Sequence, residues 1–472
     1  MKQHILTGLV ALAAFALSAC DDYTEIMPKG KNLLVTTEQL EMLLNKEYYL
    51  SGESDAILIG DCYPTASNIP NMVSQPAPSL GQVLTLWLDD VNREPLVAQD
   101  GFYTNYYSVI GKIANPILMQ IDDASGDEAM KRQLKAEALV LRAYFGYLLV
   151  NHFAKAYHQS TAANDGGIPY PREDNDIATP NEKYTVQQVY DMICEDLQNA
   201  IDLNSLPDVN VNQMRVSKAF AYAVMAKVMM SMGRYGDAEK YADLSLSINN
   251  HIADYNQMVE MGMYGNREFH RMYMECEEDL FFTHNDLSLR AFTPEYLARF
   301  EEGSVVRNCY PSDKNIFGFP YFGPTFYGMN IECWYLADNT FFNEAGLSTT
   351  DMYLIKAEVS LRNNQITDAM QLLDLIRVNR IMPESYAPCA GTITNKGEAI
   401  AKFKQVARTE KVMSVMNYID IKRWNSENNE WTETEQKNIL GKEYTLKPTS
   451  QLWIWTFPSN ATSLNPNLTQ NY

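Results

Sequence analysis

The sequence predicts a mainly α-helical protein in which paired helices form a scaffold beside a loop-rich, irregular part. The segment Lys135–Phe153 has helical character, and beyond Arg142 it carries no charge up to Val150, which is typical of a helix buried within a bundle. A helix–turn–helix pattern that starts near Ser217 occurs a second time further along the chain. Between the two copies lies a segment rich in glycine, proline and aromatic residues, which excludes a long helix there.

The beginning of the chain predicts a secretory signal peptide over residues 1–19. Lys2 supplies a positive start, and an apolar run from Ile5 to Leu17 follows it. This run is too short to cross a bilayer, so it is read as a signal rather than as a membrane span. We therefore expect the remainder of the chain to be exported.

The end of the signal, Leu17-Ser18-Ala19-Cys20, resembles a bacterial lipobox. The resemblance implies that Cys20 is lipidated and that cleavage occurs before it, and several acyl chains would anchor the protein firmly. The alternative is a secreted protein in which Cys20 has no special role. Residues 20–36 then form a lipid-anchored tether, whose first acids, Asp21 and Asp22, resemble the surface-export signal of Bacteroidetes lipoproteins.

Composition excludes some classes of partner and site. The formal charge of −21 repels phosphate backbones, so we expect no nucleic acid as a partner. Apart from Cys20, the cysteines occur singly without a zinc-binding spacing. We expect them to be small buried thiols, although export permits disulfides whose pairing the sequence does not give. These cysteines are Cys62, Cys194, Cys276, Cys309, Cys333 and Cys389.

The repeated pattern predicts two tetratricopeptide-like hairpins. In the first copy, Ser217–Met232 forms a helix, Gly233 ends it in the left-handed conformation, and Asp237 caps the next helix. In the second copy Asn364 replaces Gly233, and asparagine tolerates the same conformation. Beyond about residue 381 we expect one helix around Ala401–Trp424 and a short strand at Gln451–Phe457.

The insertion at about residues 250–345 carries the best functional signal. Binding residues often lie on loops held by a rigid scaffold, and flat aromatic rings can stack on the apolar faces of sugars for ~0.5–1.5 kcal/mol each. The alternative is that the rings attach an irregular loop to the body, but we expect at least two to be exposed. The rings are Tyr310, Phe317, Phe319, Tyr321, Phe322, Phe326, Tyr327, Trp334 and Tyr335.

Several segments, in order along most of the mature chain, resemble the SusD/RagB family of outer-membrane nutrient-binding lipoproteins. Leu141-Arg142-Ala143-Tyr144 is similar to the family's most recognisable segment, and Asp420-Ile421-Lys422-Arg423-Trp424 is similar to its Asp-Leu-Lys-Arg-Trp. The chain departs from the family at Ser414, Val415 and Asn417, which places it in a divergent branch. Other similar segments are Gly167-Ile168-Pro169-Tyr170, Asp196-Leu197, Arg215-Val216-Ser217-Lys218 and Asn465–Asn471.

The resemblance implies a SusD-like fold, a superhelix of tetratricopeptide-like hairpins packed against a loop-rich half. It implies a single domain over 37–472, with the scaffold at about 37–250 and 346–380 and the ligand-binding part at about 251–345 and 381–472. It also implies a cell-surface position on the outer membrane and a partner, a SusC-like TonB-dependent outer-membrane transporter, which the lipoprotein covers as a lid. Ligands of the family are glycans in many members and peptides in some.

The family's ligand contacts come from an early loop and from the central insertion. We expect Trp87, Tyr321 and Trp334 to stack on a ligand, and Asp89, Arg93 and Arg307 to bind its polar groups. Arg423 and Trp424 match a family motif, but we interpret them as a structural clasp. The full set of predicted ligand-binding residues is Tyr63, Trp87, Asp89, Arg93, Arg307, Tyr321, Phe322 and Trp334.

No catalytic motif accompanies these features, so we expect a binding protein and not an enzyme. Acidic pairs such as Asp89-Asp90, Asp122-Asp123 and Glu277-Glu278-Asp279 are interpreted as solvated surface groups. Four functions stay open: oligosaccharide capture, peptide capture, a lipoprotein glycoside hydrolase with two carboxylates across a cleft, and a structural lid without a ligand. We expect no cofactor, and a structural calcium ion is not indicated.

Overall fold

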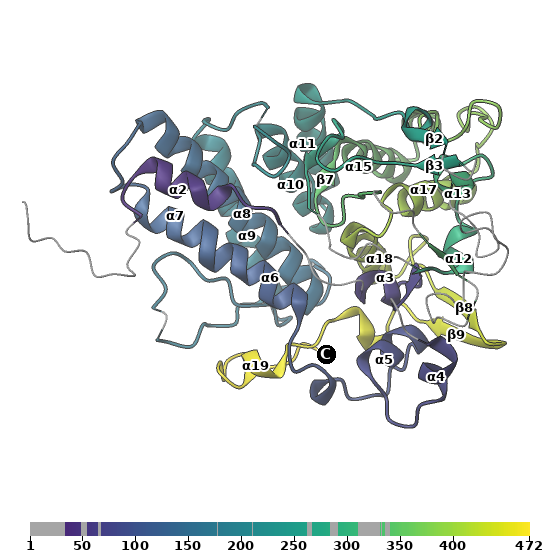
Figure 1. Cartoon of the computed structure of the whole chain (residues 1–472), viewed down its shortest axis with the longest axis horizontal. Coiled ribbons are helices and arrows are strands. Elements are labelled where there is room, and N and C mark those ends of the chain that lie inside the picture. Colours follow the sequence, from purple (N-terminus) through teal and green to yellow (C-terminus); the bar gives the residue numbers. More distant parts are fainter. Residues whose placement is uncertain are drawn as a thin grey trace, which may run out of the picture.

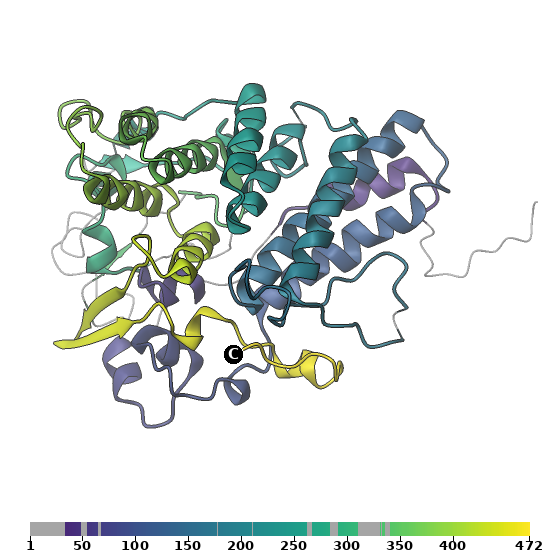
Figure 2. The ribbon, with the colours of Figure 1, turned by 180° about the vertical axis from the view of Figure 1, so that it is seen from behind.

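Helices dominate the structure, and they form two parts that pack side by side (Figures 1 and 2). The computed structural model describes residues 34–48, 54–64, 68–176, 178–209, 211–261, 267–283, 291–309, 331, 333–335 and 340–472. The first part is the helical scaffold, and the second is an irregular part of short helices, short strands and loops. The predicted mainly α fold with tetratricopeptide-like hairpins is confirmed.

The scaffold consists of consecutive helices that pack as antiparallel neighbours. The pairs α8–α9, α10–α11 and α15–α16 are hairpins, and α11 also packs against α15, so the second copy of the repeat lies on the first. The scaffold elements are α2 (Thr37–Leu44), α6 (Gly101–Val109), the π-helical turn η3 (Ile110–Ala114), α7 (Asn115–Gln120), α8 (Glu128–Phe153), α9 (Val186–Asp202), α10 (Lys218–Ser231), α11 (Tyr235–Ile248), α15 (Thr349–Arg362) and α16 (Ile366–Arg377).

Helix α8 is the central helix, and buried polar contacts fix its neighbours. Asp127 caps it by accepting a hydrogen bond from the Met130 amide, so the helix begins before the expected Lys135. Gly146 lets the ring of Tyr170 pack directly against the backbone of α8. A Cβ atom at residue 146 would lie only 2.4 Å from that ring. The Tyr170 hydroxyl donates to Asp196 at 2.7 Å, and Arg142 donates to the same carboxylate at 2.7 and 2.8 Å. Helices α8 and α9 are thereby joined by a buried ion pair.

The turns of the two repeated hairpins agree with the sequence, except for one cap. Gly233 and Asn364 are both left-handed, with φ of 72° and 60°. Asp237 does not cap α11, because that helix begins two residues earlier and has Arg234 at its N-cap without a side-chain bond. Instead, the Asp237 carboxylate accepts a hydrogen bond from Arg234 at 2.8 Å on the surface.

The irregular part contains only short strands, arranged as a three-stranded sheet β1-β5-β6 and the antiparallel pairs β2–β3, β4–β7 and β8–β9. The early segment 54–96 lies in this part beside β8 and β9 (Figure 1), and not in the scaffold as expected. The elements are α3 (Ser54–Leu58), β1 (Cys62–Tyr63), α4 (Ile69–Ser74), α5 (Leu80–Leu86), η2 (Glu94–Leu96), η4 (Tyr255–Met258), β2 (Val259–Met261), β3 (Arg267–Phe269), β4 (Asp279–Phe281), β5 (Ala291–Phe292), α12 (Pro294–Leu297), α13 (Val305–Cys309), β6 (Trp334–Tyr335), β7 (Leu347–Ser348), α17 (Lys396–Glu410), α18 (Val415–Glu427), β8 (Glu435–Ile439), β9 (Lys442–Leu446), η6 (Gln451–Trp453) and α19 (Ser459–Thr462).

Two expectations for the last third of the chain are wrong. The single helix at Ala401–Trp424 is two helices, α17 and α18, because Met413 adopts the left-handed conformation with φ of 58°. Ser414 then caps α18 by accepting a hydrogen bond from the Met416 amide at 3.2 Å. The expected strand at Gln451–Phe457 is instead the 3-10 helix η6, capped by Ser450 and followed by extended chain, and Arg93 binds the carbonyl oxygens of Gln451 and Ile454.

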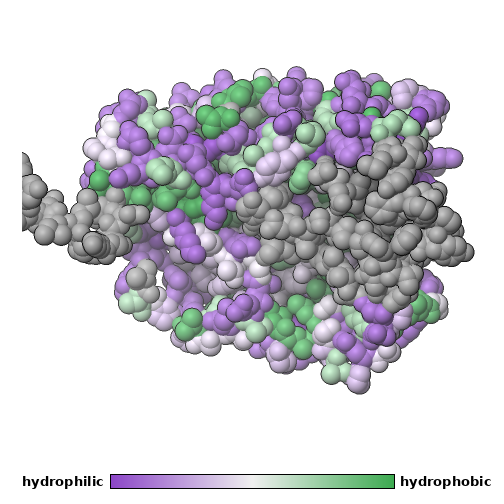
Figure 3. Space-filling view, viewed as in Figure 1, coloured by the Kyte–Doolittle hydropathy of each residue, from purple (hydrophilic) through white to green (hydrophobic). Residues whose placement is uncertain are grey.

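One large hydrophobic cluster contains side chains from both parts, from Leu40 in α2 to Leu468 near the C-terminus. Of the six cysteines after Cys20, five are buried and Cys194 is partly buried, as expected of core thiols. The face seen in Figure 3 is mostly hydrophilic, with scattered apolar groups. Within the described ranges, no helix has both the length and the apolar character that a membrane span requires.

Candidate functional site

The structure contradicts the predicted stacking role of Trp87. The residue ends α5 in the left-handed conformation, and its side chain is only 7% exposed. Its indole Nε1 donates to the Leu58 carbonyl at 2.6 Å, and the Lys437 Nζ lies 3.8 Å from the centre of the ring. Burial lowers the pKa of Lys437 to about 7. One ring face and the polar edge of Trp87 are therefore occupied by the protein itself.

Tyr63 and Arg93 are also buried by structural contacts, whereas Asp89 is exposed but hydrogen-bonded within the protein. Tyr63 is buried in β1 opposite Ala291. The Asp89 carboxylate accepts from the Ser450 hydroxyl at 2.8 Å and from the Gln451 amide at 3.0 Å. Arg93 is buried and donates to the carbonyls of Ile454 and Gln451 at 2.8 and 3.0 Å. Asp89 and Arg93 together fasten the C-terminal segment to the early stretch. Burial lowers the pKa of Arg93.

The other predicted ligand-binding residues belong to the central insertion. Arg307 is exposed, and it donates to the Phe300 carbonyl at 3.1 Å. Trp334 is partly buried in β6, whose backbone pairs with Phe292. Tyr321 and Phe322 lie outside the described residues. Ligand binding by Arg307, Tyr321, Phe322 and Trp334 stays a prediction.

Arg423 and Trp424 form a structural clasp, as predicted. Arg423 makes two hydrogen bonds of 2.7 Å to Glu358 in α15, and the indole of Trp424 donates to the same carboxylate at 3.2 Å. The neighbouring Asp420 accepts from Lys227 in α10 at 3.0 and 3.1 Å and from Lys411. Helix α18 is thus fastened to both copies of the repeated hairpin.

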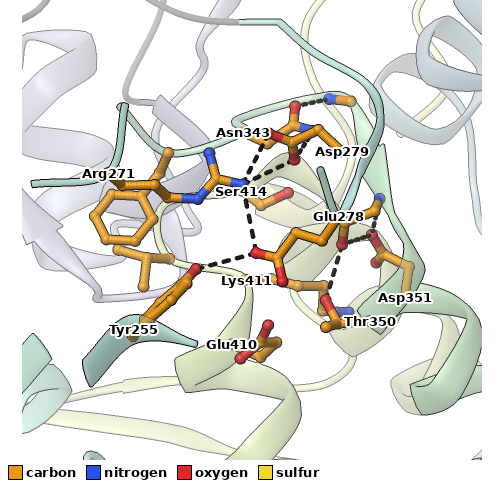
Figure 4. A pocket seen from close by; sticks show the side chains of 14 residues that line it. Tyr255, Arg271, Glu278, Asp279, Asn343, Thr350, Asp351, Glu410, Lys411 and Ser414 are labelled. Atoms are coloured by element: carbon orange, nitrogen blue, oxygen red, sulfur yellow. Dashed lines mark hydrogen bonds and ion pairs between the residues drawn. The ribbon is translucent and has the colours of Figure 1, made fainter. Parts of the chain in front are cut away.

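A charged hollow lies where the α15 N-terminus, the corner between α17 and α18 and the segments around β4 and β7 converge (Figure 4). It encloses about 350 Å³, part of which is open to solvent. Water-sized groups can occupy only about 30 Å³ of it, which is room for a few waters and well below the size of ligand pockets. The side chains that line it include Arg271, Lys411 and four acids, Glu278, Asp279, Asp351 and Glu410.

Ion pairs hold three of the four acids in this hollow. Arg271 donates to both oxygens of Asp279 at 2.8 Å. Arg380 binds Glu278 at 2.8 Å and Glu410 at 2.7 Å. Burial raises the pKa of Asp279, although Arg271 opposes the shift. Burial also acts to raise the pKa of Glu278, but Arg380 and Arg271 outweigh it, and this pKa lies below its ordinary value.

The interpretation of Glu277-Glu278-Asp279 as solvated acids is wrong for two of the three residues. Glu277 is exposed, but Glu278 and Asp279 are buried at the start of β4. The apolar run Leu280-Phe281-Phe282 directly after them is the signal that could have indicated their burial. Asp89-Asp90 and Asp122-Asp123 are exposed, as expected.

The fourth acid, Asp351, differs from the others because it has no basic partner among the described residues. Its Oδ2 accepts from the Ser348 amide at 2.9 Å in the capping box of α15. Its Oδ1 and the Nε of Arg271 are buried and have no hydrogen-bond partner within the described part of the chain. Both atoms are enclosed by the surrounding side chains and have almost no accessible surface.

A second hollow of about 390 Å³ lies next to the first, and Tyr255 and Glu410 line both. The guanidinium of Arg380 stacks on the ring of Tyr255 at 3.7 Å from its centre. In the described residues, no group of three or more histidine, cysteine, aspartate or glutamate side chains could hold a metal ion.

Comparisons with known proteins agree with this architecture. A SusD-like family model described as "starch-binding associating with outer membrane" matches residues 73–230. No curated protein sequence matches the chain. Among solved structures, a SusD superfamily protein from Bacteroides thetaiotaomicron has 16% identity and a TM-score of 0.66, covering 93% of this chain and 100% of the other. A putative sugar binding protein from Bacteroides vulgatus has 17% identity and a TM-score of 0.64, covering 93% and 99%. Surface glycan-binding protein A from Bacteroides uniformis has 16% identity and a TM-score of 0.66, covering 92% and 99%.

Proposed function

Since this chain is a SusD/RagB-family protein, we propose that it captures carbohydrate at the cell surface. In this proposal a lipid on Cys20 holds the protein on the outer membrane, and the loop-rich part binds oligosaccharides without cleaving them. The ligand then passes to a TonB-dependent outer-membrane transporter, which the protein covers as a lid. The observation that carries the proposal is the match of residues 73–230 to a family described as starch-binding.

Trp334 and Arg307 are the described residues of the insertion that this proposal assigns to the ligand. Trp334 is partly buried, so one side of its indole packs on the protein while the remainder can meet a sugar ring. Arg307 is exposed and can donate to sugar hydroxyls. Tyr321 and Phe322 belong to the same segment of the sequence, and the proposal includes them as stacking residues.

Peptide capture is the second candidate, and the burial of tryptophans favours it. Trp87, Trp424, Trp431, Trp453 and Trp455 are all less than 10% exposed, and Trp334 is partly buried, so no indole is fully available to a sugar. The charge of −21 would attract basic peptides over several ångströms.

The carboxylates of the hollow do not support the hydrolase alternative. A general acid needs a carboxyl group with a raised pKa and an oxygen that is free to give its proton to the leaving group. The pKa of Asp279 is raised by burial, but both of its oxygens accept from Arg271, and Asn343 donates to one of them at 2.9 Å. Binding without turnover therefore fits this arrangement better.

A glycan array and a peptide array, probed with the protein lacking residues 1–20, test the proposal. We expect weak binding to a group of related oligosaccharides, reduced about tenfold by Trp334→Ala, since one stacking contact is worth about 1 kcal/mol or slightly more. Arg132→Ala, on a helix of the scaffold, is the control. Binding to basic peptides alone would replace the first candidate by the second, and binding to neither would leave the structural lid.

A further inference from the structure

The β8–β9 hairpin packs against the early segment 54–96 through a small hydrophobic cluster, separate from the main core (Figure 1). Ile439 of β8 is a member of this cluster, and Tyr444 of β9 packs against it. An isolated two-stranded hairpin is at best marginally stable in water, so the order of this hairpin depends on the contact. The buried members of the cluster are Tyr63, Ile69, Met72, Leu86, Ala291, Cys333 and Ile439.

Lys437, in the middle of β8, is buried at the same contact without a polar partner. The residue is 4% exposed, and its Nζ lies 3.8 Å from the centre of the Trp87 ring at the end of α5. Among the described residues this Nζ has no hydrogen-bond acceptor and no ion-pair partner. The face of an aromatic ring attracts a cation, but it compensates only a part of the cost of taking an ammonium group out of water.

The acids around Lys437 are engaged elsewhere. Arg408 binds both Asp61 and Glu435, and one oxygen of Glu295 accepts from the Asn438 amide at 3.0 Å. Because no carboxylate of the described residues forms an ion pair with Lys437, burial lowers the pKa of this lysine to about 7. The titratable groups that face it are Asp61 and Cys62 at β1, Glu295 in α12, Glu435 in β8, and Tyr444 opposite it in β9.

We propose that Lys437 makes the docking of the β8–β9 hairpin sensitive to protons: the neutral amine stays against Trp87, and the protonated form favours release of the hairpin. Release also reaches the strands that carry Trp334. Cys333 precedes Trp334 directly, and Ala291 belongs to β5, which pairs with β6, and both are members of the small cluster. Control of ligand binding at Trp334 therefore follows, and this second step rests on the proposed function, whereas release of the hairpin does not.

The direction of the effect follows from the two pKa values of Lys437. The pKa is about 7 in the docked hairpin and 10.5, its ordinary value, after release, so the docked state holds fewer protons. Docking therefore strengthens as the pH rises from 7 toward 10.5, weakens as the pH falls, and stays constant well below 7. Since one proton is involved, the ratio of docked to released hairpin changes at most about tenfold for each pH unit.

Amide hydrogen exchange of the protein lacking residues 1–20 tests the release, because exchange detects openings that are rarely populated. The reporters are the ladder amides of β8 and β9 and the Asn438 amide, which Glu295 binds. Protection factors remove the intrinsic effect of pH on exchange. We expect protection of the hairpin to rise about sixfold to tenfold between about pH 7.5 and 8.5, while protection of α8 changes less. A protection factor of the hairpin that does not change with pH would overturn the proposal.

Lys437→Met keeps a long side chain against Trp87 but removes the amine. We expect its hairpin to be protected equally at both pH values, and at pH 7.5 at least as well as in the wild type. Lys442→Met is the matched control, since Lys442 is exposed in β9 of the same hairpin, and it should keep the wild-type change with pH. The same change in Lys437→Met would contradict the role of Lys437.

Glycan binding of the wild type and Lys437→Met at the same two pH values tests the link to Trp334. We expect binding by the wild type to be weaker at the lower pH, and binding by the variant to be equal at both. Hairpin protection that changes with pH while wild-type binding does not would contradict this link. Hydrogen exchange needs no ligand, so an absence of glycan binding would contradict the proposed function and leave the release of the hairpin standing.

Discussion

The scaffold helices and the region around the hollow both bury charged side chains, but they satisfy them to different extents. From α6 to α11, the buried side-chain atoms without a hydrogen-bond partner in the described residues are the Tyr106 hydroxyl and the Gln213 Oε1. Around the hollow and beneath the early stretch such atoms are more frequent; one belongs to Asp351 at the start of scaffold helix α15, and the others include those of Asp61, Arg271, Glu295, Arg408 and Glu433. Because native proteins leave few buried polar atoms unpaired, this difference separates a region built for stability from one that retains unused polar capacity.

The largest expected effect comes from removing the clasp that joins the two regions. Asp420→Ala takes one carboxylate away from Lys227, Lys411 and Arg423, which leaves buried cations without their partner. We expect the free energy of unfolding, measured in urea, to fall by about 3–5 kcal/mol. Asp243→Ala is the control because Asp243 forms an exposed ion pair with Lys356, which should cost about 1 kcal/mol or less. Similar losses for the two variants would show that the clasp does not carry this stability.

A second test concerns the two tryptophans that the sequence predicted as stacking residues. Trp87→Ala should lower the free energy of unfolding by about 3–5 kcal/mol, since it removes a large side chain from the core. Trp334→Ala should change stability less and reduce glycan binding instead, because the Trp334 side chain is only partly buried. Chemical denaturation and the glycan array measure the two effects on the same pair of variants. A stable Trp87→Ala that loses glycan binding would restore the original prediction.

The fold could be predicted because its signals are local. The uncharged run after Arg142 indicated a buried helix, and Gly233 and Asn364 marked the ends of two helices whose left-handed φ values agree with this reading. Local patterns failed to predict the N-cap of α11, for which Asp237 was expected, and the interruption of a helix at Met413. Helix α11 begins two residues before Asp237, which therefore does not cap it, and the left-handed Met413 divides one expected helix into two.

The site was harder to predict because burial there depends on contacts between residues far apart in the sequence. Trp87 is buried under Lys437, and Arg93 binds the carbonyl of Ile454, so neither position could be judged from its own neighbours. Glu278 is paired with Arg380 in the same way. The burial of the unpaired Oδ1 of Asp351 likewise depends on tertiary packing, which no spacing in the sequence encodes.

Two buried acids, Glu358 in the scaffold and Asp61 in the irregular part, should also respond to pH with opposite sign. Burial acts to raise the pKa of Glu358, but Arg423 and Arg362 outweigh it, and this pKa falls to about 2. Its contribution to stability is therefore complete above its unfolded value of 4.5 and is lost as the pH falls toward 2. Burial raises the pKa of Asp61 to about 6, although Arg408 opposes the shift. The contribution of Asp61 is therefore complete below its unfolded value of 3.8 and is lost as the pH rises through 6.

Unfolding in urea at a series of pH values, comparing the wild type with Glu358→Gln and Asp61→Asn, measures these contributions. The stability advantage of the wild type over Glu358→Gln should increase with pH between 2 and 4.5, the unfolded value. The difference between the wild type and Asp61→Asn should change in the opposite direction between 3.8 and 6. Each slope is at most about 1.4 kcal/mol per pH unit, the value for one proton. Two slopes of the same sign would contradict the expected difference between Glu358 and Asp61.

The smallest effect is expected within the scaffold itself, where the two copies of the hairpin use different residues at the same left-handed turn. A Cβ atom at Gly233 would meet nothing within 4 Å, so Gly233→Ala should lose only the backbone preference, about 1 kcal/mol. Asn364→Gly, at the matching turn of the second copy, should change the free energy of unfolding by a few tenths of a kcal/mol at most, because both residues tolerate this conformation. Thermal unfolding of the two variants distinguishes these cases. If Gly233→Ala were as stable as the wild type, the turn would be able to leave the left-handed conformation without cost, and the end of α10 would be set by packing against α11 alone.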